Sequence, residues 1–190
     1  MDKNLLLRQY DFELEQRNNL TSSVGIPVVA ITVVGSAISA LALDYGYMDS
    51  ISCYFFVVFV LVSIVFFIAS TFFLFRSFWG YEYQKIPSPK ILSKYEKDLT
   101  EWFGSNRESC KSEDFISTAK DEFEMYLHEK IIEATDWNGQ NNLRRGNFLH
   151  MSAVTVAIAL FALIPACGLY VADKIFRVEK VQKIEVINFN

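Results

Sequence analysis

Three long apolar runs without a single charged side chain dominate the pattern along this chain. They cover residues 24–43, 51–75 and 151–172. A bilayer core requires about 20 apolar residues of helix, so each run is long enough to cross a membrane. Backbone polar groups have no water to bind in lipid, and each run is therefore expected to be a helix.

Outside these runs, apolar residues recur three or four positions apart, which is typical of amphipathic helices. This spacing predicts helices over residues 4–20, 91–103 and from residue 115 onwards. Only Gly139 and Gly146 interrupt the last pattern before the third run, so it predicts one helix of roughly 60 residues, about 90 Å long. The two glycines mark either a hinge or a close approach between helices.

Three further features are predicted from a proline, a helix-capping serine and the residue types at the C-terminal end. The second run is expected to continue as helix through residues 76–86, because Pro87 disfavours helix in the residue before it. Residues 104–114 are expected to form a loop in which Ser112 caps the next helix. The C-terminal residues 177–189 have weak strand character.

The predicted fold is an all-α membrane protein with three transmembrane helices, an N-terminal helical hairpin plus a C-terminal span. A juxtamembrane helix (1–23) precedes the hairpin (24–75). A small helical cytoplasmic domain (76–150) follows, and its long helix runs into the third transmembrane helix (151–172) and a short tail (173–190).

Lysine and arginine are distributed asymmetrically around the runs. Residues 76–150 contain eleven of them, and the turn 44–50 contains none. Positively charged loops stay inside, which predicts a cytoplasmic N-terminus and an external turn. Four more basic residues in the tail fit this topology poorly, so the third run either carries the C-terminus outward or re-enters.

Several function classes lack their usual signals. No run contains the charged residue that ion-coupled transporters place in the membrane. The three cysteines fit neither a zinc site nor a disulfide framework, and no phosphate loop or nucleophile motif is present. We therefore expect no catalytic residue, no metal and no cofactor, and the chain is not expected to be an enzyme.

A polar cluster precedes the third run, and its members are Asn138, Asn141, Asn142, Arg144 and Arg145. Most of them share one helix face at separations of three, four and seven. One interpretation is a solvated face whose arginines reach lipid headgroups. The other is a layer that meets its symmetry copies, or a phosphate-bearing signal, and acts as gate or signal-binding site.

A second candidate is a stripe of small polar residues in the first run, formed by Thr32, Ser36 and Ser39. Small residues let membrane helices pack closely. The stripe either packs against another span or lines the pore of an oligomer. The second run carries many phenylalanines, among them Phe55, Phe56, Phe59, Phe66, Phe67, Phe72 and Phe73, and is expected to face lipid.

The layout of the chain resembles the SLATT proteins, the SMODS- and SLOG-associating membrane effectors of bacterial anti-phage systems. The likeness rests on the N-terminal hairpin, the helical domain after it and the asparagine–arginine segment near its end. It implies a homo-oligomeric, gated pore or ion channel in the bacterial inner membrane. A sensor or signal-producing partner, or a nucleotide or oligonucleotide signal, would control it.

Two alternatives remain open at this point. Arg145 and His150 have the R-x4-H spacing that resembles the motif of HEPN ribonucleases, which would make the chain a membrane-tethered RNase. The third hypothesis is a non-conducting membrane anchor or accessory subunit whose soluble helices bind a partner protein.

Overall fold

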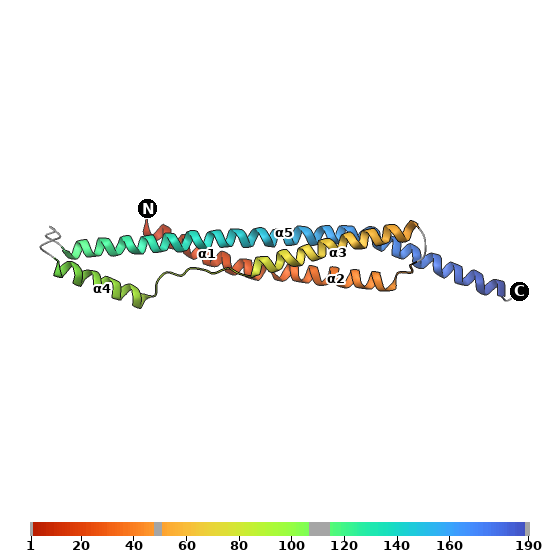
Figure 1. Ribbon diagram of the computed structural model, residues 1–190, viewed down its shortest axis with the longest axis horizontal. Coiled ribbons are helices and arrows are strands. Elements are labelled where there is room, and N and C mark those ends of the chain that lie inside the picture. The colour runs from red at the N-terminus through yellow and green to blue at the C-terminus, as the bar shows by residue number, and fades with distance from the viewer. Residues whose placement is uncertain (1, 48–50, 107–114, 189–190) are drawn as a thin grey trace. The chain divides into compact units, whose positions relative to one another are not determined.

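The computed structural model describes residues 2–47, 51–106 and 115–188, of which residues 115 and 177–188 are described by their backbone alone. Five helices account for most of this part, and it contains no strand (Figure 1). They are α1 (Lys3–Ser23), α2 (Gly25–Asp44), α3 (Ile51–Phe78), α4 (Pro89–Ser105) and α5 (Phe115–Asn188). α4 includes Gly104 and Ser105, which were expected to lie in the loop 104–114, and the rest of that loop from residue 107, with its cap Ser112, lies outside the described residues.

The all-α membrane fold is confirmed. The described part has three stretches that are long and apolar enough to cross a membrane, Lys3–Asp44, Ile51–Phe78 and Ile116–Phe176. Within the first stretch only Val24 separates α1 from α2, and its φ of −60° and ψ of −28° are still helical, so the two helices follow one another almost without interruption. Pro27 follows in the first turn of α2, where its missing N–H costs little.

α3 ends earlier than the sequence predicts. It stops at Phe78, and residues 80–88, here called the strap, form no regular structure. Gly80 has a φ of 89°, a backbone conformation that glycine adopts without steric cost. The prediction that the helix continues through residue 86 is therefore wrong, because Gly80 turns the chain out of the helix. The strap's backbone bonds with side chains of α5 instead of continuing the helix.

α5 is one continuous helix of 74 residues. Its length confirms the predicted long helix, and it excludes both the strand expected over residues 177–189 and a re-entrant third span within residues 115–188. Gly139 marks a close approach between helices, since a Cβ built there would lie 3.3 Å from Glu13 Oε1 of α1.

The chain divides into two compact units, each assembled from two stretches of sequence. The polar unit comprises Met1–Leu20 and Gly80–Arg144, and the apolar unit comprises Thr21–Trp79 and Arg145–Asn190. In the polar unit, Leu6 and Tyr10 of α1 are buried against Ile131 and Ala134 of α5. These contacts explain the apolar spacing of both segments.

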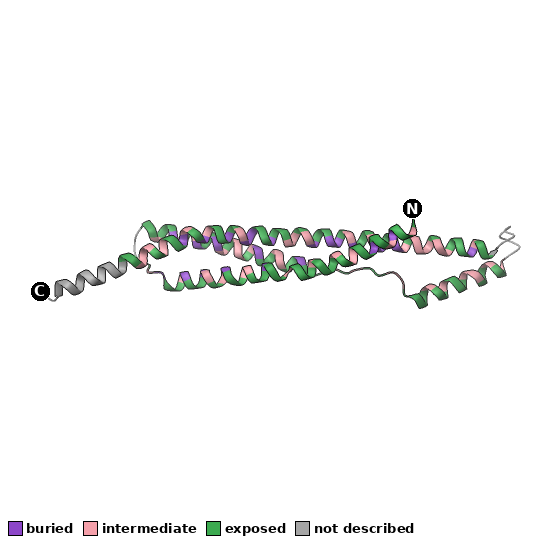
Figure 2. Cartoon of the chain, turned by 180° about the vertical axis from the view of Figure 1, so that it is seen from behind, coloured by how far each residue is buried: buried purple, intermediate pink, exposed green. Residues whose placement is uncertain are grey.

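The apolar unit packs α2, α3 and α5 around one core. Phe56 is fully buried and its ring stacks on that of Tyr45, with centroids 3.7 Å apart. Phe55 and Phe72 are exposed, whereas Phe59, Phe66, Phe67 and Phe73 are half-buried. The side of α3 that packs inside the unit cannot face lipid, and lipid contact stays a prediction for its exposed side (Figure 2).

Gly80 permits a direct test of the strap's first turn. Gly80→Ala is expected to lower the free energy of unfolding by about 1 kcal/mol, because alanine resists positive φ. A steric clash would not contribute to this loss of stability, since no atom lies within 4 Å of a Cβ built at Gly80. Gly168 of α5 has equal room and helical φ, so Gly168→Ala should be neutral or stabilising. Denaturant titration of both variants in detergent measures the difference, and equal effects would contradict the prediction.

Candidate functional site

The asparagines of the polar cluster hold the strap. Asn138 is fully buried, and its side-chain amide pairs with the backbone of Gln84 in both directions. The Gln84 N–H donates to Asn138 Oδ1 at 2.9 Å, and Asn138 Nδ2 donates to the Gln84 carbonyl, also at 2.9 Å. One amide thus satisfies the donor and the acceptor of a strap residue, as a neighbouring strand would.

Two residues earlier, the Glu82 carbonyl is also bound by side chains of α5. The Glu82 carbonyl accepts from Asn141 Nδ2 at 2.7 Å and from the Trp137 indole N–H at 2.8 Å. Within the described residues the strap has no neighbouring strand to bond with. Side chains of α5 therefore take the place of a strand's backbone.

Asn142 joins the strap to α1. Its Nδ2 donates to the Glu13 carbonyl and to Glu13 Oε2, both at 2.8 Å, and its Oδ1 accepts from the Tyr83 hydroxyl at 2.7 Å. The Arg17 guanidinium lies over the Tyr83 ring, 4.8 Å from its centroid. Helix α1, the strap and α5 are thereby connected through one buried amide.

The two arginines differ. Arg145 belongs to the apolar unit and is buried, with Nε donating to the Ser77 carbonyl at 3.0 Å and Nη2 to Thr21 Oγ1 at 3.1 Å. It binds a carbonyl in the last turn of α3, where helical carbonyls lack partners. Arg144 is exposed.

Asn138, Asn141 and Asn142 of α5 thus all bind the strap. Arg145 instead binds the end of α3, and Arg144 is exposed. These four buried side chains form neither a solvated face nor a layer open to symmetry copies in this protomer. Their role as gate or signal-binding site stays a prediction, and the contacts show that they hold the chain's own backbone. The sequence could not reveal this, because nothing in it marks residues 82–84 as their partners.

The stripe of Thr32, Ser36 and Ser39 lies on the exposed side of α2. Each hydroxyl donates to the carbonyl four residues earlier at 2.9 Å. The stripe therefore does not pack against α3 or α5 within the protomer. Its role in lining a pore stays a prediction.

A serine ladder that the sequence analysis missed joins α3 to α5. Ser70 Oγ donates to the Ser152 carbonyl at 2.8 Å, and Ser152 Oγ donates back to the Ser70 carbonyl at 3.0 Å. Seven residues earlier on α3, Ser63 Oγ lies 3.2 Å from the Ala159 carbonyl. Ser77 and Arg145 complete the series at the same spacing. The heptad repeat of serines in α3 was the available signal.

Polar and charged side chains connect the end of α2 to α5 residues 170–174. Lys174 Nζ lies 2.7 Å from Asp44 Oδ2, and the Tyr170 hydroxyl donates to the same carboxylate. The Gly46 N–H donates to Asp173 Oδ2 at 3.3 Å. Lys174 thus has an acidic partner at the end of α2, next to the predicted external turn.

Arg145 and His150, the pair with the R-x4-H spacing, are not brought together within this protomer. Arg145 is bonded to backbone, whereas His150 is exposed; five residues along a helix rotate the two by roughly 140°. No group of three or more His, Cys, Asp or Glu among the described residues could hold a metal ion.

Comparisons of the chain with models of protein families, with curated proteins and with solved structures give no match. The likeness to SLATT effectors therefore rests on layout alone and remains a prediction.

Proposed function

We propose that this chain is a homo-oligomeric membrane effector that forms a gated pore or ion channel, with its N-terminus in the cytoplasm of a bacterium. The likeness to SLATT effectors adds anti-phage defence as the setting, and a nucleotide or oligonucleotide signal or a partner protein as the trigger. Three apolar helices are too few to enclose a channel, so copies must assemble around an axis.

The observation that carries the proposal is the exposed hydroxyl stripe of α2. The exposed side of α3 is bulky and apolar, with residues such as Phe55, Leu61 and Phe72. α2 also exposes apolar residues such as Val29 and Val33, but it presents Thr32, Ser36 and Ser39 outward as well. In an oligomer these small hydroxyl residues suit close helix packing or a polar pore lining, whereas the α3 side suits lipid.

The strap supports the gating part of the proposal. α5 continues without interruption from Asn138 and Asn142 into the third span. A signal that displaces the strap would change the contacts of α5. Because α5 also forms the third span, the change could reach the pore through this one helix. Exposed Arg144 is the arginine available to a phosphate-bearing signal.

A matched pair of threonines tests the pore. Thr32 on α2 and Thr71 on α3 are both exposed, and each hydroxyl is bonded to its own helix at 2.9 Å. In liposomes that contain the purified chain, Thr32→Leu is expected to lower ion flux about tenfold, because leucine narrows and dries the lining. Thr71→Leu makes the same chemical change on the side assigned to lipid and should leave flux unchanged.

Equal flux from both variants would remove α2 from the pore. Liposomes that stay tight with the wild-type chain at every membrane potential, although it is oligomeric in detergent, would contradict the pore itself. That result would favour the membrane anchor instead. RNA cleavage that is lost in His150→Ala would favour the tethered RNase.

A further inference from the structure

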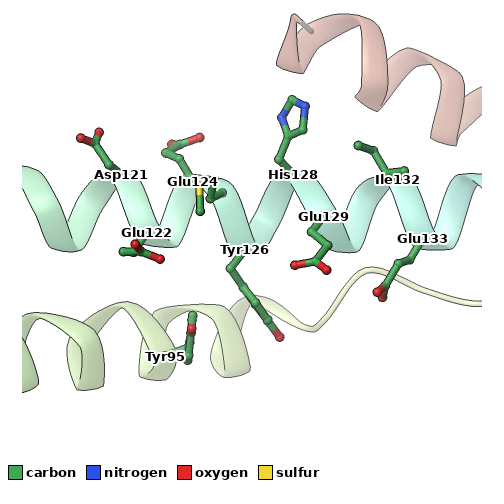
Figure 3. A pocket seen from close by; sticks show the side chains of 10 residues that line it. Tyr95, Asp121, Glu122, Glu124, Tyr126, His128, Glu129, Ile132 and Glu133 are labelled. Atoms are coloured by element: carbon green, nitrogen blue, oxygen red, sulfur yellow. The ribbon is translucent and has the colours of Figure 1, made fainter.

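The strap lies on α1 and α5 as an extended segment. Figure 3 shows it as the pale trace that joins α4 and runs beside α5. Glu82, Gln84 and Ile86 bond with these two helices through their backbone groups. In an extended chain the backbone groups of every second residue point to the same edge. One edge of the strap is therefore bound at successive positions, as in a peptide that pairs with the edge of a sheet.

Little of the strap itself is buried. None of residues 80–88, all of which are described, is buried, and the side chains of Glu82, Gln84 and Lys85 are exposed. The free energy needed to open a segment locally is low where few apolar groups are buried. The strap is held largely by hydrogen bonds to its backbone, and such bonds do not depend on the identity of the residue that carries the backbone group.

The surface under the strap, here called the amide surface, consists of Trp137, Asn138, Asn141 and Asn142 of α5. Its three asparagines are at most 7% exposed. Trp137 Nε1 and Asn141 Nδ2 both donate to one carbonyl, that of Glu82. Asn138 offers a donor and an acceptor to the backbone two residues later. A ligand that replaces the strap must supply a carbonyl and, two residues later, an N–H and a carbonyl, which is the backbone of an extended polypeptide.

Two side chains of the strap define what else this surface accepts. The Tyr83 hydroxyl donates to Asn142 Oδ1 at 2.7 Å, and the Arg17 guanidinium lies over the Tyr83 ring. Three residues later, the half-buried Ile86 packs against the buried core between α1 and α5. The two positions between them are exposed. The amide surface therefore suits an extended segment that carries tyrosine and, three positions later, an aliphatic residue.

We propose that the amide surface is a peptide-binding site, which the strap fills in the resting chain and which an extended segment of a partner protein fills in its place. The partner's segment carries tyrosine and an aliphatic residue three positions later, and it makes the same bonds through its backbone. The inference rests on the proposed function and deepens it, because it gives the trigger of the effector a chemical class, a polypeptide in extended form. The two ligands compete for one surface, so binding of the partner shifts the chain to the state in which the strap is released.

Binding of a separate peptide tests the site on the full chain in detergent. Tyr83→Ala/Gln84→Pro, here called the opened chain, keeps the amide surface and weakens its own strap, because proline has no N–H to donate to Asn138. A fluorescent peptide that copies residues 80–88 is titrated with each chain, and its anisotropy is measured. It is expected to bind the opened chain about tenfold more tightly than the wild-type chain, whose tethered strap competes at an effective concentration of about millimolar.

Modified peptides separate backbone recognition from side-chain recognition. An N-methyl group on the Gln84 nitrogen removes the donor to Asn138 and should weaken binding about tenfold. The same group on the Lys85 nitrogen is the matched control and should have little effect, because that N–H points to the opposite edge. Tyr83→Ala in the peptide should also weaken binding, whereas Lys85→Ala should not. Equal losses from the two N-methyl groups would overturn recognition through the backbone.

Variants of the opened chain locate the site. Asn138→Ala is expected to weaken peptide binding about tenfold, whereas Gln140→Ala, at an exposed position of the same helix, should leave it unchanged. Circular dichroism verifies that each variant is folded, and Gln84→Pro alone replaces the double variant if the latter unfolds. A folded opened chain that does not bind the peptide overturns the inference.

Ion flux measured in parallel distinguishes this inference from the pore. Liposomes that conduct ions with the wild-type chain, together with an opened chain that does not bind the peptide, overturn the peptide site and leave the pore standing. Peptide binding by the opened chain, with no flux from either chain, supports the peptide site and contradicts the pore. Peptide binding together with flux supports both.

Discussion

Replacing Ser70 with leucine is expected to destabilise the apolar unit by about 3 kcal/mol, because the added side chain has no space between α3 and α5. Ser70 is fully buried, and its hydroxyl lies 3.1 Å from that of Ser152. Two serine side chains permit a close approach of the helices that leucine would prevent. Titration of the folded protein in mild detergent with a denaturing detergent measures the free energy of unfolding.

The neighbouring Thr71 provides the control. It is exposed, and its hydroxyl is bonded only to the Phe67 carbonyl of its own helix among the contacts described. Thr71→Leu should therefore change the free energy of unfolding by less than about 0.5 kcal/mol. Ser70→Ala, which removes the hydrogen bonds and keeps the close packing, should cost about 1 kcal/mol. If Ser70→Leu is as mild as Ser70→Ala, the helices are not held at close approach.

Removing the Asn138 amide is expected to release the strap. Asn138→Ala breaks two hydrogen bonds to Gln84 and leaves a cavity, which should cost about 2 kcal/mol. The Gln84 N–H is protected by Asn138 itself. Its hydrogen exchange should therefore accelerate about 30-fold, the equivalent of that energy. Hydrogen exchange over residues 82–86, read by mass spectrometry in detergent, tests the prediction.

Gln140 is the matched control two residues away. It is exposed, and its amide donates to Asp136 of the same helix at 2.9 Å. Gln140→Ala should leave exchange in the strap unchanged. Unchanged exchange in Asn138→Ala as well would show that the strap is held by other contacts, such as the hydrogen bond from the Ile86 N–H to the Tyr10 hydroxyl at 3.3 Å.

The amide cluster shows how a correct pattern can have an incorrect interpretation. Spacing places Asn138, Asn141 and Asn142 on one helix face, and the structure agrees. The sequence analysis assigned that face to water, to symmetry copies or to a signal. Most of the true partners are backbone groups of Glu82, Gln84 and Glu13, and Asn142 also bonds with the Tyr83 hydroxyl and the Glu13 carboxylate. A backbone group carries no residue-specific mark, so no sequence pattern identifies it as a partner.

The three apolar runs, the long α5 and the amphipathic helices were determined by the sequence alone. Length and periodicity suffice for these elements, because lipid requires internally bonded backbone and helical spacing exposes one apolar side. The end of α3 at Phe78, the strap and the ladder of Ser63, Ser70 and Ser77 were decided only by the tertiary structure. Each depends on a distant segment that provides a hydrogen-bond partner or room for close packing. In the ladder, the bonded residues lie more than sixty positions apart in the sequence.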